Sequence, residues 1–146
     1  DAATIEPRQG GVDQLELTFS NAITGTPDVA VAGPGGPYTA VVTGSGATRS
    51  VAISPALQNG ACYTFTLSAG TVSETLIGDL DCCVRTLAGD MTGNATVNLG
   101  DVLYAKTKLG QALPAFDYDL SGAVDAADLA AIKALVQSVS KEGAVE

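Results

Sequence analysis

The chain has 146 residues, of which 46% are hydrophobic but only 5% aromatic, and it carries a formal net charge of −9 with no histidine. This acidic balance argues against a nucleic-acid partner, because nucleic-acid affinity depends on Lys and Arg neutralising phosphates. The lack of histidine also disfavours zinc sites, haem ligation and Cys–His catalysis. No run is long and apolar enough to predict a membrane span.

Residues 1–88 are predicted to form an all-β sandwich. Leu15, Leu17 and Phe19 alternate with polar neighbours, which is the period of a half-buried strand. Gly- and Pro-rich segments separate this run from later ones, as turns separate the strands of a sandwich. The further strands are expected at Val29–Val31, Tyr38–Val42, Arg49–Ile53, Tyr63–Leu67 and Val84–Leu87, with a weaker one around Glu74–Leu80.

The segment Leu57–Phe65 resembles the tyrosine corner of immunoglobulin-like and fibronectin-type sandwiches. In those domains a Tyr near the start of a late strand hydrogen-bonds back to the backbone of the preceding turn. Tyr63 is the residue in that position. The alternative is an ordinary core tyrosine.

Three cysteines, Cys62, Cys82 and Cys83, favour one disulfide and one leftover thiol. If the strand containing Tyr63 pairs with the next strand through a turn near Gly70–Ser73, Cys82 lies opposite Cys62, within bridging distance. We therefore expect a Cys62–Cys82 disulfide, with Cys83 as the other candidate partner and free thiols as the alternative.

The C-terminal third contains one twelve-residue pattern twice, as DMTGNATVNLGD (90–101) and DYDLSGAVDAAD (117–128). Both copies place oxygen-bearing side chains at positions 1, 3, 5, 9 and 12, and an apolar stretch with helical spacing follows each. Calcium needs six to eight oxygens at such a spacing, so the repeat predicts two calcium sites. Gly122 permits the sharp turn at position 6, where the first copy has Ala95.

Position by position, each loop supplies six ligands, with a backbone carbonyl at position 7. Those of the first loop are Asp90, Thr92, Asn94, Thr96 (carbonyl), Asn98 and Asp101. Those of the second loop are Asp117, Asp119, Ser121, Ala123 (carbonyl), Asp125 and Asp128. The second loop has four carboxylates and the first has two, so the second site is expected to be tighter.

A loop followed by a helix, repeated twice over residues 89–139, resembles the type I dockerin module. That resemblance implies a calcium-folded unit that binds a cohesin-like domain, in a secreted or cell-surface protein and in the setting of polysaccharide degradation. It also implies partner contacts at loop positions 10 and 11 and at a repeated lysine. Here those positions are Leu99, Gly100, Ala126, Ala127, Lys106 and Lys133, and a solvated helix face is the alternative for the two lysines.

The expected fold class is α+β as two units, with an immunoglobulin-like sandwich (1–88) and a small all-α, dockerin-like pair of calcium loop–helix motifs (89–146). The expected function is attachment through the calcium module, in the non-catalytic C-terminal region of a protein with further domains upstream. The alternative is a carbohydrate-binding module with a calcium-stabilised appendage. No nucleophile motif such as GxSxG is present, which disfavours an enzyme.

Overall fold

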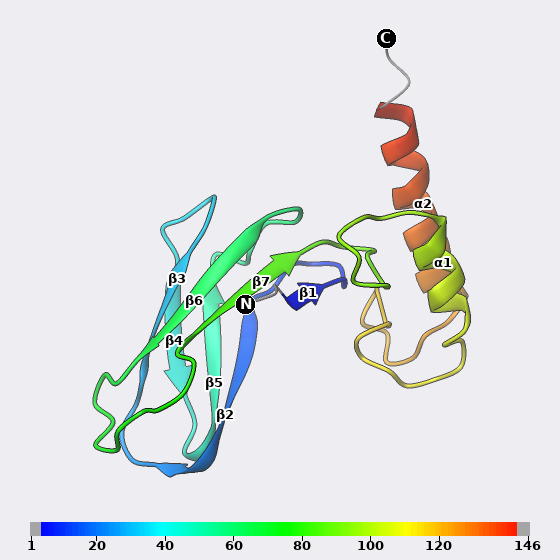
Figure 1. The fold of residues 1–146 in the computed structure, drawn as a ribbon. Helices are drawn as coiled ribbons and strands as arrows, with labels where there is room; N and C mark the ends of the chain where they lie inside the picture. The colour runs from blue at the N-terminus through cyan, green and yellow to red at the C-terminus, as the bar shows by residue number, and fades with distance from the viewer. Residues whose placement is uncertain (1–3, 143–146) are drawn as a thin grey trace. The chain divides into compact units, whose positions relative to one another are not determined.

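The computed structural model describes residues 4–142. This part of the chain contains seven strands and two helices (Figure 1). The strands are β1 (Thr4–Glu6), β2 (Gln14–Ile23), β3 (Asp28–Ala32), β4 (Thr39–Thr43), β5 (Gly46–Ser54), β6 (Cys62–Ser68) and β7 (Asp81–Thr86). The helices are α1 (Leu99–Lys106) and α2 (Ala126–Glu142). None of the described helices is both long and apolar enough to cross a membrane.

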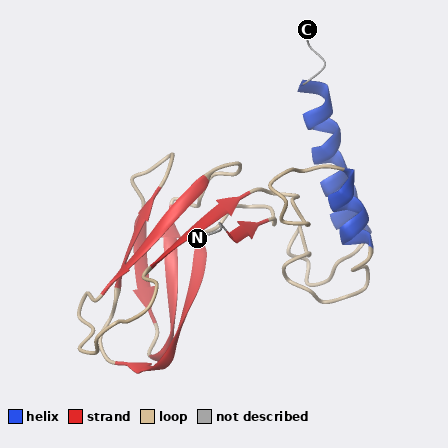
Figure 2. Ribbon diagram, viewed as in Figure 1, coloured by secondary structure: helices blue, strands red, loops and turns tan. Residues whose placement is uncertain are grey.

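The strands form a sandwich of two sheets (Figure 2), in which β2–β5, β4–β5, β3–β6 and β6–β7 pair antiparallel. One sheet has the order β1-β7-β6-β3 and the other has the order β2-β5-β4. Exposed and half-buried residues alternate along β2, β3 and β4, because one face of each sheet turns toward the core. The buried core residues are Val12, Val51, Ile53, Leu57, Tyr63, Phe65 and Val84.

Tyr63 makes the hydrogen bonds expected of a tyrosine corner. Its side chain is 1% exposed, and its hydroxyl accepts from the Gln58 amide at 2.8 Å while donating to the Gln58 carbonyl at 3.3 Å. Its ring also meets the Tyr38 ring edge-to-face, with centroids 5.7 Å apart. The tyrosine therefore ties the turn before β6 to the sandwich core.

A buried arginine closes one end of the β2–β5 ladder. The regular pairing ends at Thr18↔Thr48 and resumes at Ile23↔Gly46. Arg49 is 2% exposed and donates to four backbone carbonyls, including those of Ile23 (2.9 Å) and Gly25 (3.1 Å). The guanidinium thus binds backbone carbonyls of both β2 and β5 where their ladder is interrupted.

Two expectations for the sandwich are wrong. The segment Glu74–Leu80 is not a strand, and β6 continues to β7 through a long irregular connection. The β6–β7 register therefore places Cys62 opposite Arg85 and Cys82 opposite Phe65, so the predicted cross-strand position for a Cys62–Cys82 disulfide does not occur. All three cysteines are free thiols in the structure.

The chain divides into two compact units, and one of them is discontinuous in sequence. The first unit comprises Asp1–Thr4 and Val12–Arg85, and the second comprises Ile5–Gly11 and Thr86–Glu146. This division differs from the predicted ranges 1–88 and 89–146, because the segment Ile5–Gly11 belongs to the second unit. Within that unit, the amides of Leu87 and Gly89 donate to the carbonyls of Glu6 (3.0 Å) and Pro7 (2.7 Å).

The second unit has a small core that repeats across its two halves. Met91 and Tyr118 both occupy loop position 2, and both are buried; Ala105 of α1 and Ile132 of α2 are matching positions, and both are fully buried. Val102 and Leu129, also matching, pack against this cluster. Each loop therefore contributes to the core through the residue after its first aspartate.

The predicted fold class is wrong in its C-terminal part. The described chain is mostly β, with two short helices, and no separate all-α unit is evident. Residues Ile5 and Glu6 of β1 belong to the second unit, and most of its remaining backbone is irregular loop. The physical reason is that side-chain oxygens, rather than helical hydrogen bonds, bind the loop amides.

Candidate metal centre

The first loop is built around two buried aspartates, Asp90 and Asp101, which are 1% and 0% exposed. The Asp90 carboxylate accepts from the amides of Asn94 (3.1 Å) and Ala95 (2.7 Å). The Asp101 carboxylate accepts from the amides of Thr92 (2.9 Å) and Asn98 (2.8 Å). Four backbone donors thus converge on the first and last residues of the loop, which fixes its curvature.

The second loop repeats these hydrogen bonds at matching positions. Asp117 accepts from the amides of Ser121 (3.0 Å) and Gly122 (2.7 Å). Asp128 accepts from the amides of Asp119 (3.1 Å) and Asp125 (2.7 Å). The sequence repeat is therefore also a repeat of geometry, and in both loops the position-1 and position-12 carboxylates face the loop interior.

Both loops also share two left-handed backbone positions. Positions 4 and 6 have positive φ in each copy: Gly93 (71°) and Ala95 (66°) in the first, Leu120 (61°) and Gly122 (105°) in the second. Each loop thus places glycine at one of these positions and a side-chain-bearing residue at the other. A non-glycine residue in this region is strained, so each loop holds one strained residue.

The first turn of each helix is capped by its own loop. Asn98 is the N-cap of α1; its side chain accepts from the Gly100 amide at 2.7 Å, while Asp101 reaches back to the Asn98 amide. Asp125 accepts from the Ala127 amide at 2.6 Å in the same way. Position 12 therefore belongs both to the loop and to the first turn of the helix, where a negative charge is favourable.

The second loop gathers three carboxylates. Oxygen atoms of Asp117, Asp119 and Asp128 lie within 4.8 Å of one another. Asp125 is exposed, and its carboxylate caps α2, so the structure does not place it in this cluster. The Ala123 carbonyl, expected at position 7, accepts a hydrogen bond from the Ser121 hydroxyl at 3.2 Å. Three such carboxylates repel one another unless a cation balances them.

The first loop offers fewer charges and more neutral oxygens. The Thr92 hydroxyl lies 2.9 Å from Asp101 and 3.3 Å from Asp90, so these three predicted ligands are brought together. Asn94 instead accepts from the Thr96 amide at 2.9 Å and is exposed. The Thr96 carbonyl accepts from the Asn98 side chain at 3.5 Å. All the candidate metal-ligand atoms in both loops are hard oxygens, which suits calcium.

Residues 5–11 contact the second loop, and the sequence pattern gave no sign of this. The Gln9 amide donates to the Tyr118 carbonyl at 3.0 Å, and its side chain donates to the Asp119 carbonyl at 3.3 Å. Arg8 pairs with Glu6 at 2.6 Å. The hydrogen bond to Glu6 raises the pKa of Arg8, and the charge of Asp117 adds a smaller effect in the same direction.

All six predicted partner-contacting residues are exposed, namely Leu99, Gly100, Lys106, Ala126, Ala127 and Lys133. The two copies differ in chemistry. The first copy presents large apolar side chains, because Leu99 (58% exposed) and Leu103 (57% exposed) lie one helical turn apart on α1. The second copy has alanines at the matching positions 126 and 130.

Comparison with known proteins identifies no relative of this chain. No protein-family model matches it, and neither a curated protein nor a solved structure matches it significantly.

Proposed function

We propose that the second unit binds two calcium ions and attaches this chain to a protein partner. The observation that carries the proposal is the repeated geometry of the two loops, in which positions 1 and 12 are buried aspartates that accept matching backbone amides. The residues that would hold the ions are the six predicted ligands of each loop, Asp90, Thr92, Asn94, Thr96, Asn98 and Asp101 in the first and Asp117, Asp119, Ser121, Ala123, Asp125 and Asp128 in the second. In the second loop the oxygens of Asp117, Asp119 and Asp128 already lie close together, which supports the stronger site there.

Calorimetric titration of the whole chain with calcium, after treatment with EDTA, tests metal binding. Two binding events, or one event with a stoichiometry of two, support the proposal. Magnesium is the matched control, because it demands a smaller octahedral site and retains its waters, so it should bind more weakly. A chain that binds neither ion at millimolar concentration would contradict the proposal.

The attachment role rests on the dockerin-like motif and on the exposed positions of the loop ends and helices. A cohesin-like domain is the partner that the motif indicates. Leu99 and Leu103 offer an apolar contact, and Lys106, one turn further along α1, offers a positive charge beside it. A partner surface with an apolar centre and acidic margin would complement this face.

A panel of cohesin-type domains immobilised for biolayer interferometry, with calcium present, tests attachment. The double variant Leu99→Asp/Leu103→Asp should abolish binding, while Ala126→Asp/Ala130→Asp, at the matching positions of the second copy, serves as control. Loss of binding in the control alone would place the contact on α2 instead. No binding to any domain of the panel would contradict this class of partner.

The expected setting outside the cell fits this proposal, because calcium is abundant there and even weak sites fill. The carbohydrate-binding alternative has less support. Sugar platforms need exposed aromatic rings, and the described aromatics of the sandwich, Phe19, Tyr38, Tyr63 and Phe65, are buried or half-buried. We therefore propose attachment, without catalysis, as the function of this region.

A further inference from the structure

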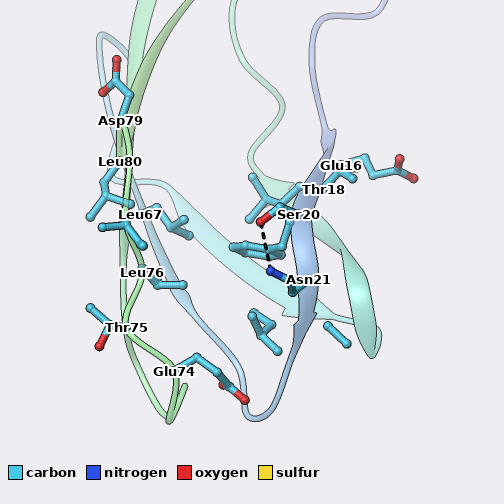
Figure 3. Close-up of a pocket in the computed structure, with 15 residues that line it drawn as sticks. Glu16, Thr18, Ser20, Asn21, Leu67, Glu74, Thr75, Leu76, Asp79 and Leu80 are labelled. Carbon is cyan, nitrogen blue, oxygen red and sulfur yellow. Dashed lines mark hydrogen bonds between the residues drawn. The ribbon is translucent and has the colours of Figure 1, made fainter.

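The outer edge of β2 lines a cleft of about 480 Å³ in the sandwich (Figure 3). Among the described strands, β2 pairs only with β5, so its other edge has no strand beside it. All eight residues from Glu16 to Ile23 line the cleft. Since successive side chains of a strand point to opposite faces, a hollow that touches every residue runs along the strand's edge.

The opposite wall is the irregular segment 74–80, which is fixed at both ends. At one end the Glu74 carboxylate accepts from the Thr24 amide at 3.0 Å and from its hydroxyl at 2.9 Å. At the other end the Leu80 carbonyl accepts from the Leu67 amide at 2.7 Å. Between these anchors Ile77 is 91% exposed. Segment 74–80 is thus held in place at both ends. It contains no strand that could pair with β2.

The lining combines an apolar floor with acidic margins. Leu17, Phe19 and Leu67 contribute apolar surface, and a smaller pocket of about 130 Å³ shares Leu17 and Leu67 with the cleft and is also lined by the core residue Phe65. Glu16, Glu74 and Asp79 supply carboxylates, whereas no Lys or Arg lines the cleft. The Thr24 hydrogen bonds lower the pKa of Glu74, which keeps this carboxylate ionised.

We propose that this cleft binds an extended segment of a partner protein, about eight residues long with alternating aliphatic side chains and flanking lysines or arginines, as an added strand along β2. Strand addition uses the backbone groups of a sheet edge for affinity and side-chain pockets for selectivity. The pocket beside Leu17 takes one aliphatic side chain, and the carboxylates attract the basic flanks. A second copy of this chain is a poor occupant, because it would bring Glu16 and a net charge of −9 against the same acidic margin.

The test measures fluorescence anisotropy of labelled octapeptides with the whole chain in calcium. The basic probe is KTVTVTVK, and the matched probes are ETVTVTVE and KTVPVPVK, in which proline removes backbone donors. The basic probe should bind at least roughly ten-fold more tightly than either matched probe. The charge-reversal variant Glu16→Lys/Asp79→Lys should weaken it by a similar factor. The control Asp13→Lys/Asp28→Lys makes the same charge change at exposed residues that do not line the cleft.

Contacts between amide protons of the bound peptide and those of residues 16–23, seen in isotope-edited nuclear magnetic resonance spectra, would support strand addition. Equal binding of the acidic and basic probes would overturn the proposal, as would unchanged affinity in Glu16→Lys/Asp79→Lys. Binding of cellohexaose in place of every peptide, or sedimentation showing a dimer that Glu16→Lys disrupts, would assign the cleft to a different occupant and would also overturn it. Circular dichroism of each variant ensures that a lost signal reflects binding and not unfolding.

Discussion

Asp90 and Asp117 make the same pair of hydrogen bonds in two different loops: each carboxylate accepts the amides four and five residues further along the chain. Both carboxylates are buried, at 1% and 5% exposure. A buried carboxylate is tolerated when donors or a cation surround it, and here the backbone supplies only part of that environment.

Removal of calcium should destabilise the second unit selectively. The oxygens of Asp117, Asp119 and Asp128 approach within 4.8 Å, so their mutual repulsion rises when no cation is bound. We expect EDTA to lower helical circular dichroism and the melting temperature of this unit, and calcium to restore both. Amide resonances of the sandwich core, such as those of Val51 and Phe65, serve as the internal control. Helicity that EDTA leaves unchanged would contradict the prediction.

The two sites should differ in affinity, with the second loop tighter. Asp128→Ala removes a carboxylate from a cluster of three and should abolish the stronger calorimetric event, whereas Asp101→Ala should leave one strong site. Each change also leaves two loop amides without an acceptor, so roughly 2–5 kcal/mol of stability should be lost in either variant. Because each variant loses two backbone hydrogen bonds, a larger loss of calcium affinity in Asp101→Ala would show that carboxylate number does not set the order.

Replacing Ala95 by glycine should stabilise the first loop. Ala95 has φ of 66°, a conformation that costs an L-residue about 1–2 kcal/mol and glycine far less. Thermal unfolding in EDTA should show the gain. The reverse change, Gly93→Ala, is the control: φ there is 71° and an added Cβ meets nothing within 4 Å, so any loss reports backbone strain alone. Equal stability of the two variants would argue that the loop relaxes around position 6.

Tyr63→Phe should destabilise the sandwich by about 1–3 kcal/mol, since it removes two part-buried hydrogen bonds, one from the Gln58 amide and one to the Gln58 carbonyl. Urea unfolding measures this change. Tyr38→Phe is the matched control: its hydroxyl donates to the Pro34 carbonyl at an exposed site, and its loss should change stability by less than Tyr63→Phe. A smaller effect at Tyr63 than at Tyr38 would show that the turn before β6 does not depend on the tyrosine corner.

Alkylation of Cys82 should depend on pH over a higher range than for an ordinary thiol. Cys82 is exposed at the surface, but partial desolvation by the surrounding protein raises its pKa, and the nearby Cys83, Asp81 and Asp79 act in the same direction. A raised pKa leaves less thiolate at a given pH below it, so modification by iodoacetamide should be slow near neutral pH and accelerate as pH rises. Peptide mapping by mass spectrometry follows each thiol separately. A Cys82 that forms a disulfide, or reacts fastest near neutral pH, would contradict the prediction.

The parts of the fold that the sequence predicts well are local. The alternation at Leu15–Phe19 predicts β2, and the twelve-residue spacing predicts that positions 1, 3 and 12 of each loop come together, because every carboxylate–amide bond there spans nine residues or fewer. The other predicted ligand side chains, such as those of Asn94 and Asp125, lie outside these groups. The predicted β6–β7 register is wrong because the prediction assumes a tight turn near Gly70, whereas the connection between the two strands is long and irregular. The cleft beside β2 has no sequence pattern at all, since its walls come from distant segments.

The grouping of Ile5–Gly11 with Thr86–Glu146 makes the sandwich an insertion within the second unit. During synthesis Val12–Arg85 is translated before the second loop, so the early segment cannot contact Tyr118 until the whole sandwich has been made. To complete its fold, the second unit must then bring Gln9 to Tyr118, which is translated more than a hundred residues later. Proteolytic cleavage after residue 88 would leave Ile5–Gly11 on the N-terminal fragment, and the C-terminal fragment would have to fold without them.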